Sequence, residues 1–309
     1  MKRGEGNDAV TTLSLAGQPS PMPLELTPYY RAGRGTPLVM LHGASMSWRA
    51  WRPVLPLLTG RHDVFAPTLP GHRGGPEPVS NGEPNIDTVA DQLCAQLDEA
   101  GIETAHLVGN SLGGWLAFEL ARRGRARSVL AISPAGSWQA RRDLVKLLWT
   151  FRVGFTAVDN PRLSPLSGNR LLRRVGLSRV LAHPGRLSEA DEQNMVDDMR
   201  ACTLLRALMG GSVRVEPMTD FDVALCPVHI AWAERDRIIP YRRYGRPMQR
   251  VVRGARFSVL PEVGHVPMHD DPRLVARTIL EQTTAVDADA ATEEPGPGLA
   301  RFRRRRRSA

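Results

Sequence analysis

Short apolar runs alternate with amphipathic stretches along most of the chain. Continuous apolar runs are typical of strands that are buried on both faces of a parallel sheet. The predicted strands span residues 37–43, 63–67, 106–108, 128–133, 228–233 and 255–260. The stretches with apolar residues at helical spacing are predicted helices at residues 49–59, 86–100, 112–124 and 272–283. This order predicts an α/β fold with a mostly parallel, doubly wound sheet.

Both ends of the chain depart from this alternation. Residues 1–23 contain three prolines and little periodicity, so we expect a flexible leader. Residues 24–31 form a weak candidate for an early edge strand, which Pro28 interrupts. Residues 285–309 are rich in Asp, Glu, Pro and Gly before an arginine run, and we expect them to be a disordered tail.

The alternation also stops in the middle of the chain. Residues 137–218 are irregular and helical, with Trp138 and Trp149 near their start. We expect a helical insertion that covers the carboxyl edge of the sheet as a lid. The same aromatic residues could equally fill a small core of the insertion. The α/β core is then divided between residues 24–136 and 219–284.

The strongest local motif is Gly-Asn-Ser-Leu-Gly at residues 109–113, between a predicted strand and a predicted helix. Glycine is needed at both ends because the strand and helix backbones approach closely there. The strained turn presents the Oγ atom of Ser111 at the sheet edge, as in a nucleophile elbow. Alone, the motif also fits a glycine-rich turn of any α/β protein, so a histidine base and a carboxylate must accompany it.

Asp236 and His265 are the candidates for these partners. Asp236 follows the predicted strand 228–233, and His265 follows the predicted strand 255–260. The chain order Ser111, Asp236, His265 is that of one fold among those that use a serine triad. Because parallel strands end at the same sheet edge, we expect these three side chains to meet there.

Other polar residues near the strand ends have competing interpretations. The backbone N–H groups of Ala44 and Leu112 are candidates for an oxyanion hole. His42 precedes Gly43 at a strand end, and we expect a structural hydrogen bond rather than catalysis. His72 lies in a turn-rich loop and is expected to fix that loop.

Two residues compete directly with the predicted base and acid. His269 lies four residues after His265, and we expect it to face outward. Glu234 is a weaker alternative to Asp236 as the carboxylate that orients the histidine.

Composition and charge exclude several classes of protein. The 309 residues are 42% hydrophobic and 24% charged, which is ordinary for a globular protein. The net charge is +9, but residues 301–309 carry six arginines and no acid, which leaves +3 for residues 1–300. The arginine-rich end predicts at most weak, salt-sensitive binding of acidic surfaces and no specific nucleic-acid partner.

The cysteines and the short apolar runs predict that the protein is located in a reducing compartment. The three cysteines lie far apart in sequence, so neither a zinc site nor a disulfide framework is predicted. No apolar run has the length of a signal peptide or of a membrane span. A cytoplasmic enzyme is therefore expected.

Taken together, these motifs resemble the α/β-hydrolase superfamily over residues 24–283. The resemblance rests on His42-Gly43, Gly109–Gly114, residues 234–240 and residues 264–267. It implies an α/β-hydrolase fold with Ser111 as nucleophile, His265 as general base and Asp236 as its orienter. It also implies oxyanion donors at Ala44 and Leu112 and requires neither a cofactor nor a metal.

Departures from known branches leave the substrate open. The Gly-Asn-Ser-x-Gly-Gly elbow is similar to that of carbon–carbon bond hydrolases of aromatic ring-cleavage products, but residues 44–47 lack their glycine-proline-glycine loop. Proline iminopeptidases differ at the same loop. Serine at position 111 argues against haloalkane dehalogenases and epoxide hydrolases, which need a carboxylate nucleophile.

The resemblance thus predicts a serine hydrolase that cleaves an ester of a small to medium apolar substrate. We expect Trp115, Trp138 and Val266 to line the pocket for this small molecule. The alternatives are a carbon–carbon hydrolase of ring-cleavage-type diketones and a non-catalytic, ligand-binding module of the same fold.

Overall fold

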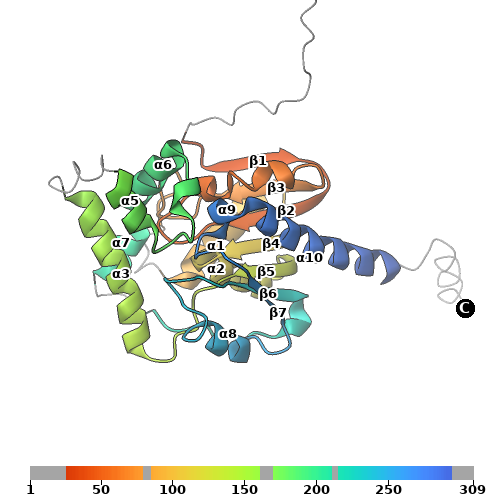
Figure 1. Ribbon diagram of the computed structural model, residues 1–309. Coiled ribbons are helices and arrows are strands. Elements are labelled where there is room, and N and C mark those ends of the chain that lie inside the picture. The colour runs from red at the N-terminus through yellow and green to blue at the C-terminus, as the bar shows by residue number, and fades with distance from the viewer. Residues whose placement is uncertain (1–25, 79–84, 161–169, 211–214, 294–309) are drawn as a thin grey trace, which may run out of the picture.

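A seven-stranded sheet forms the centre of the part of the chain that the computed structural model describes, which comprises residues 26–78, 85–160, 170–210 and 215–293 (Figure 1). Its strands are β1 (Tyr29–Gly33), β2 (Thr36–Leu41), β3 (His62–Pro67), β4 (Ala105–Asn110), β5 (Ala126–Ile132), β6 (Val228–Ala233) and β7 (Arg256–Leu260). The strand order is β1-β3-β2-β4-β5-β6-β7, with β1 antiparallel to β3 and the other neighbours parallel. The predicted α/β fold is confirmed, and the predicted leader at residues 1–23 lies outside the described residues.

Two apolar clusters cover the two faces of the sheet. Alternate residues of β2 enter different clusters, Val39 and Leu41 one and Leu38 and Met40 the other, because successive side chains of a strand point to opposite faces. The first cluster contains the buried faces of α1 (Ile86–Glu99), α2 (Leu112–Arg122) and α8 (Gly245–Val251). The second contains those of α9 (Pro267–Asp270) and α10 (Pro272–Glu293).

A helical insertion separates β5 from β6. Its helices are α3 (Arg141–Asp159), α5 (Arg170–Leu177), α6 (Glu189–Arg200) and α7 (Thr203–Met209), and they gather on one side of the sheet (Figure 1). The buried Asp198 of α6 accepts hydrogen bonds from Ser47 and Arg73 of the core, which fastens the insertion to the loops after β2 and β3. No helix of the described residues combines the length and the apolar content that a bilayer crossing demands.

The predicted helix at residues 49–59 is the element near the start of the chain that differs from the prediction. The predicted helix at residues 49–59 is replaced by two short 3-10 turns, Trp48–Trp51 and Leu55–Leu57. Pro53 and Pro56 explain this, since proline lacks the N–H that a continuous helix requires. The helix α1 is capped by Asn85 and Thr88 in a reciprocal capping box.

The last helix is longer than predicted. We expected α10 to end at residue 283 and a disordered tail from 285, but α10 continues to Glu293 and extends away from the body of the molecule (Figure 1). The cause is Asp287, whose carboxylate accepts hydrogen bonds from Thr36 Oγ1 and His106 Nε2, each at 3.0 Å. The prediction was therefore wrong for residues 285–293, and residues 294–309 with the arginine run lie outside the described residues.

Candidate active site

The turn between β4 and α2 has the backbone strain of a nucleophile elbow. Ser111 has φ 55° and ψ −115°, a conformation that is rare for a residue other than glycine. A Cβ atom at Gly109 would lie 2.1 Å from the carbonyl oxygen of Gly113, and one at Gly113 would lie 2.1 Å from that of Leu41. Both glycines are therefore required by close backbone approach, as the motif predicted.

His265 and Asp236 form a buried pair. The Nδ1 atom of His265 lies 2.7 Å from Oδ2 of Asp236, and both residues are almost fully buried. The other carboxylate oxygen, Oδ1, accepts the backbone N–H groups of Ile238 and Ile239 at 2.9 and 2.8 Å. Because a carboxylate accepts hydrogen bonds, Nδ1 is the nitrogen that carries the proton in the neutral imidazole, which leaves Nε2 as the acceptor in that form.

The loop that carries His265 is bonded directly to the elbow. The side-chain amide of Asn110 donates to the backbone oxygens of His265 and Ile132, at 3.0 and 3.2 Å. Asn110 immediately precedes Ser111, so this amide connects the strand ends of β4, β5 and β7. The carboxyl ends of β4, β6 and β7 place Ser111, Asp236 and His265 at one edge of the sheet, where His265 and Asp236 are in contact.

Two backbone donors lie beside Ser111. The N–H groups of Ala44 and Leu112 bond to no acceptor among the described residues, and both residues line the same cavity as Ser111. His42 sets the direction of the first donor. Its Nε2 accepts the N–H of Leu69 at 2.9 Å, so its Nδ1 donates to the Gly43 oxygen at 2.8 Å and fixes the peptide that carries the Ala44 N–H.

The structural interpretation of His42 and His72 is confirmed. Burial, together with the nearby His72, lowers the pKa of His42 well below its usual value, so His42 is neutral. The Nδ1 atom of His72 lies 3.0 Å from the Pro70 oxygen within its own loop, and burial lowers the pKa of His72 to about 4.

The two competing residues have other partners. Glu234 Oε2 accepts the backbone N–H of Glu262 and is occupied there. We expected His269 to face outward, but it is half-buried in α9, and burial lowers its pKa against the raising effect of Asp191 and Asp270. Packing of the insertion over α9 covers it, which the local sequence does not reveal.

Asp270 is a site residue that sequence reasoning missed. Its carboxylate accepts three backbone N–H groups, from Gly264 at 2.8 Å, Ala182 at 2.9 Å and His183 at 2.7 Å. Gly264 directly precedes His265, so Asp270 joins the loop of His265 to the insertion. No spacing rule marks such a residue, because two of its partners lie 87 and 88 positions away.

A cavity of about 570 Å³ opens beside Ser111. Its wall is mainly apolar and comes from α2, α3 and α7, including Leu144, Leu147, Leu148, Phe151, Leu204, Leu205 and Leu208. Trp115 and Trp138 line it as expected, with their rings in an edge-on contact at 5.3 Å. The indole N–H of Trp115 is buried and has no hydrogen-bond partner in the described part of the chain. The expectation for Val266 was wrong, because Val266 belongs to the apolar cluster on the other face of the sheet.

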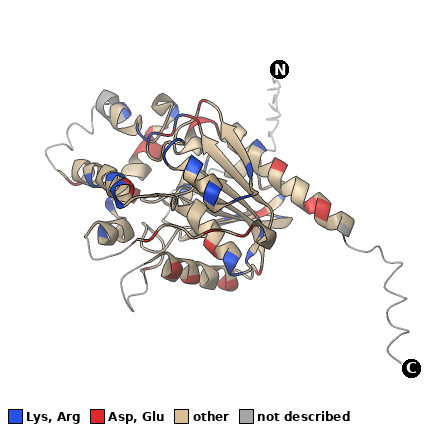
Figure 2. Cartoon of the chain, turned by 90° about the horizontal axis from the view of Figure 1, so that it is seen from below, with Lys and Arg blue, Asp and Glu red and all other residues tan. Residues whose placement is uncertain are grey.

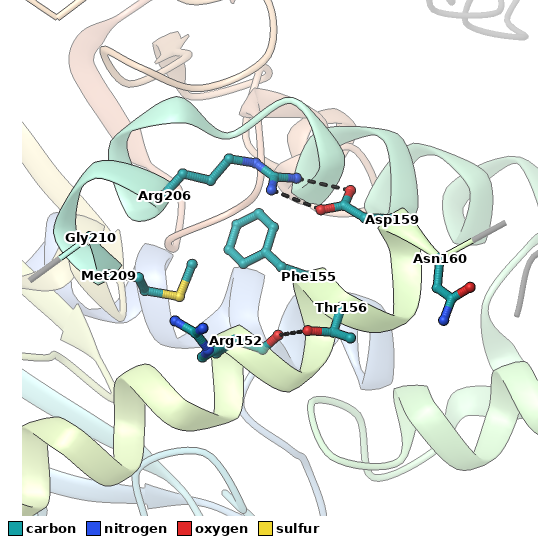
Figure 3. A pocket seen from close by; sticks show the side chains of 8 residues that line it. All are labelled: Arg152, Phe155, Thr156, Asp159, Asn160, Arg206, Met209 and Gly210. Atoms are coloured by element: carbon teal, nitrogen blue, oxygen red, sulfur yellow. Dashed lines mark hydrogen bonds and ion pairs between the residues drawn. The ribbon is translucent and has the colours of Figure 1, made fainter. Parts of the chain in front are cut away.

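A second cavity, of about 530 Å³, lies between α3 and α7 (Figure 3). It shares no lining residue with the cavity beside Ser111. Arg206 of α7 donates to both carboxylate oxygens of Asp159 at 2.8 and 3.0 Å, and its guanidinium group lies 4.3 Å from the centre of the Phe155 ring. These contacts connect the two helices that wall the cavity beside Ser111.

Comparison with known proteins agrees with this geometry. A model of the alpha/beta hydrolase family matches residues 38–278. A Mycobacterium tuberculosis protein named epoxide hydrolase EphH is 38% identical over 200 residues, which are 62% of this chain and 91% of that protein. A Pseudomonas sp. (strain CF600) protein named 2-hydroxymuconate semialdehyde hydrolase is 34% identical over 134 residues, which are 42% of this chain and 47% of that protein.

A solved structure of a thermophilic esterase from Thermogutta terrifontis superposes with a TM-score of 0.65 and 23% identity, covering 84% of this chain and 93% of that one. This likeness concerns the fold, while the family match and the 38% identical relative identify the chain as a hydrolase that belongs to the alpha/beta hydrolase family.

Proposed function

We propose that this hydrolase cleaves carboxylic esters of apolar, small to medium substrates by acyl transfer through Ser111, His265 and Asp236. The observation that carries the proposal is the buried His265–Asp236 hydrogen bond at the same sheet edge as the strained Ser111. A serine hydroxyl becomes nucleophilic when an oriented imidazole can take its proton, and Asp236 supplies that orientation.

The reaction follows from this arrangement in two steps. Ser111 Oγ attacks the ester carbonyl carbon while His265 Nε2 takes the hydroxyl proton, and the oxyanion accepts the N–H groups of Ala44 and Leu112. His265 then gives the proton to the departing alcohol. Water, deprotonated by His265, attacks the acyl-enzyme and releases the acid and the serine. Each oxyanion donor is typically worth about 3 kcal/mol of transition-state stabilisation.

The cavity supports an apolar acyl group. Its leucines and Phe151 provide an apolar wall, and its volume of about 570 Å³ is in the range of small-molecule pockets. In this proposal the helices of the insertion serve as the lid of the site.

Serine at position 111 favours an ester over an epoxide, despite the name of the relative EphH. A carboxylate that opens an epoxide forms an ester, which water can hydrolyse. A serine oxygen would form an ether, which the same site could not release. Epoxide hydrolysis therefore remains a property of that relative and is not proposed for this chain.

A carbon–carbon hydrolase is the second candidate. The identity with the 2-hydroxymuconate semialdehyde hydrolase favours it, as does the resemblance of the Gly-Asn-Ser elbow to that of carbon–carbon hydrolases. The same three residues would act, with the leaving group being a carbanion equivalent instead of an alcohol. A ligand-binding module without catalysis is disfavoured, because such a module has no use for the buried His265–Asp236 pair.

The test is ester hydrolysis by purified protein, with p-nitrophenyl esters from acetate to laurate and a ring-cleavage-type diketone in parallel. We expect ester turnover with one chain-length optimum and a loss of at least about 10³-fold in kcat for Ser111→Ala. Ser178→Ala, which removes a hydroxyl whose one hydrogen bond among the described residues is to the Val175 oxygen, serves as the control and keeps full activity. Ester activity that survives in Ser111→Ala contradicts the proposal, and turnover of the diketone alone favours the second candidate.

A further inference from the structure

The lid helix α3 has an exposed apolar stripe on its outer side. Val145, Trp149 and Val153 are 50%, 64% and 48% exposed. Their spacing of four residues places them in one row along the helix. The opposite side of α3 supplies Leu147 and Phe151 to the wall of the cavity beside Ser111. One helix thus separates solvent from the candidate site and presents a tryptophan to that solvent.

A strongly basic groove lies beside the same stripe. Its volume is about 520 Å³, and its cationic lining comprises Arg142, Lys146, Arg242, Arg243, Arg246 and Arg250. Asp143 is the single acidic residue in the lining, and it is paired with Arg243. The other five cations form no ion pair with an acidic side chain of the described residues. Helix α8, at the bottom of Figure 1, faces the viewer in Figure 2 and shows this positive charge in blue.

The stripe and the groove are continuous. Arg142 and Lys146 line the groove and lie three residues from Val145 and Trp149 respectively, so they are neighbours on the outer side of α3. We call this combined area the α3–α8 surface, defined by Val145, Trp149, Val153 and the five unpaired cations. An unpaired positive groove alone would suit any anion. The adjoining apolar stripe requires a partner that is anionic at its surface and apolar just beneath.

We propose that the α3–α8 surface binds an anionic lipid surface, with the cations on the phosphates and Trp149 among the headgroups. Basic residues are attracted to an anionic leaflet, and tryptophan favours the water–lipid boundary. Charge complementarity carries this choice of partner. The proposal rests on the proposed function in one respect, since it makes membrane-dissolved apolar esters the substrates that reach the site under α3.

The experiment is vesicle flotation of the full chain at about 100 mM salt, where charges a Debye length apart are largely screened. The vesicles are equimolar phosphatidylglycerol and phosphatidylcholine, with pure phosphatidylcholine as the neutral comparison. We expect binding to the anionic vesicles only. The double variant Arg246→Glu, Arg250→Glu should raise the lipid concentration for half-binding at least about tenfold. The control, Arg273→Glu with Arg277→Glu on α10, changes the charge equally and should bind as the wild type.

The apolar part of the surface has its own test. Trp149→Ala should weaken anionic-vesicle binding by about fivefold or more, whereas Leu225→Ala, which truncates another exposed apolar side chain, should leave it unchanged. The arginine-rich end is present in every variant and contributes equally to each. Equal binding by the Arg246/Arg250 and Arg273/Arg277 variants overturns the proposal. So does a change of oligomeric state in the first variant without vesicle binding, since that assigns the surface to a second copy.

Failure of this proposal is distinguishable from failure of the proposed function. Ser111→Ala should float as the wild type does, because Ser111 does not belong to the α3–α8 surface. The Arg246→Glu, Arg250→Glu variant should hydrolyse a water-soluble p-nitrophenyl ester at the wild-type rate. Flotation without ester turnover rejects the function alone, and turnover without flotation rejects the surface alone.

Discussion

Asp270 shows how one carboxylate can hold two distant segments together. It is 2% exposed and accepts N–H groups from the loop of His265 and from the insertion. Hydrogen bonds to a carboxylate are stronger than those between neutral groups, so three of them form a stiff connection. We therefore regard Asp270 as a positioning residue that acts through the loop of His265.

Asp270→Asn should lower kcat more than it changes KM, because an amide nitrogen cannot accept one or more of these N–H groups and His265 loses its fixed position. We expect a decrease of about 10- to 100-fold in kcat and a loss of about 1–3 kcal/mol in the free energy of unfolding. Ester kinetics and urea unfolding measure both effects. Asp271→Asn weakens only the bond to the Leu274 N–H at the start of α10, so it should cost stability and leave kcat unchanged.

At the scale of secondary structure, the sequence predicted the elements that local pattern determines. The apolar runs before His42 and before Ser111 became β2 and β4 because their central residues, 38–41 and 107–108, are apolar and buried on both faces of the sheet. The elbow was predictable because Gly109 and Gly113 are local requirements. The pairing of Asp236 with His265 was inferred from the chain order, from the strands that each residue follows and from the family resemblance.

What the sequence could not predict depends on contacts between distant residues. The extension of α10 beyond residue 283 depends on the hydrogen bonds that Asp287 accepts from Thr36 and His106. No apolar periodicity marks residues 285–293. The role of Asp270 could not be predicted either, because two of its three partners belong to the insertion. Val266 was misplaced because the single-residue shift from His265 turns a side chain from the site to the opposite apolar cluster.

The anchoring of α10 can be tested with two aspartates of the same helix. Asp287→Ala should reduce the free energy of unfolding by about 1–3 kcal/mol, because it leaves Nε2 of the buried His106 without its partner. Asp289→Ala, at an exposed position two residues later, should change stability by less than about 0.5 kcal/mol. Equal unfolding midpoints for the two variants in urea would show that Asp287 does not anchor the helix.

For the whole molecule, buried neutral histidines make stability depend on pH. His72 keeps a pKa of about 4 in the folded protein because of burial, against about 6.5 in the unfolded chain. Above pH 6.5 it is neutral in both states and has no effect. Below that pH His72 is protonated in the unfolded state but stays neutral in the folded state, so the free energy of unfolding falls as the pH drops towards 4. Burial gives His42 a shift of the same direction.

We expect His72 alone to account for a loss of about 3 kcal/mol between pH 6.5 and pH 4. His72→Asn keeps a donor for the Pro70 oxygen and removes the titrating group. The free energy of unfolding of this variant should therefore fall less steeply over that range than that of the wild type. Urea unfolding at several pH values measures both slopes, and identical slopes would mean that His72 is not the group responsible.

The central claim is that Ser111 is a nucleophile activated by His265 and Asp236. The most direct measurement is the rate and position of fluorophosphonate labelling, followed by peptide mass spectrometry. The account predicts one adduct, on Ser111, and labelling at least about 10²-fold slower in Asp236→Asn, where the imidazole loses its orienting carboxylate. An adduct on another residue, or labelling of Ser111 at an unchanged rate in Asp236→Asn, would contradict it.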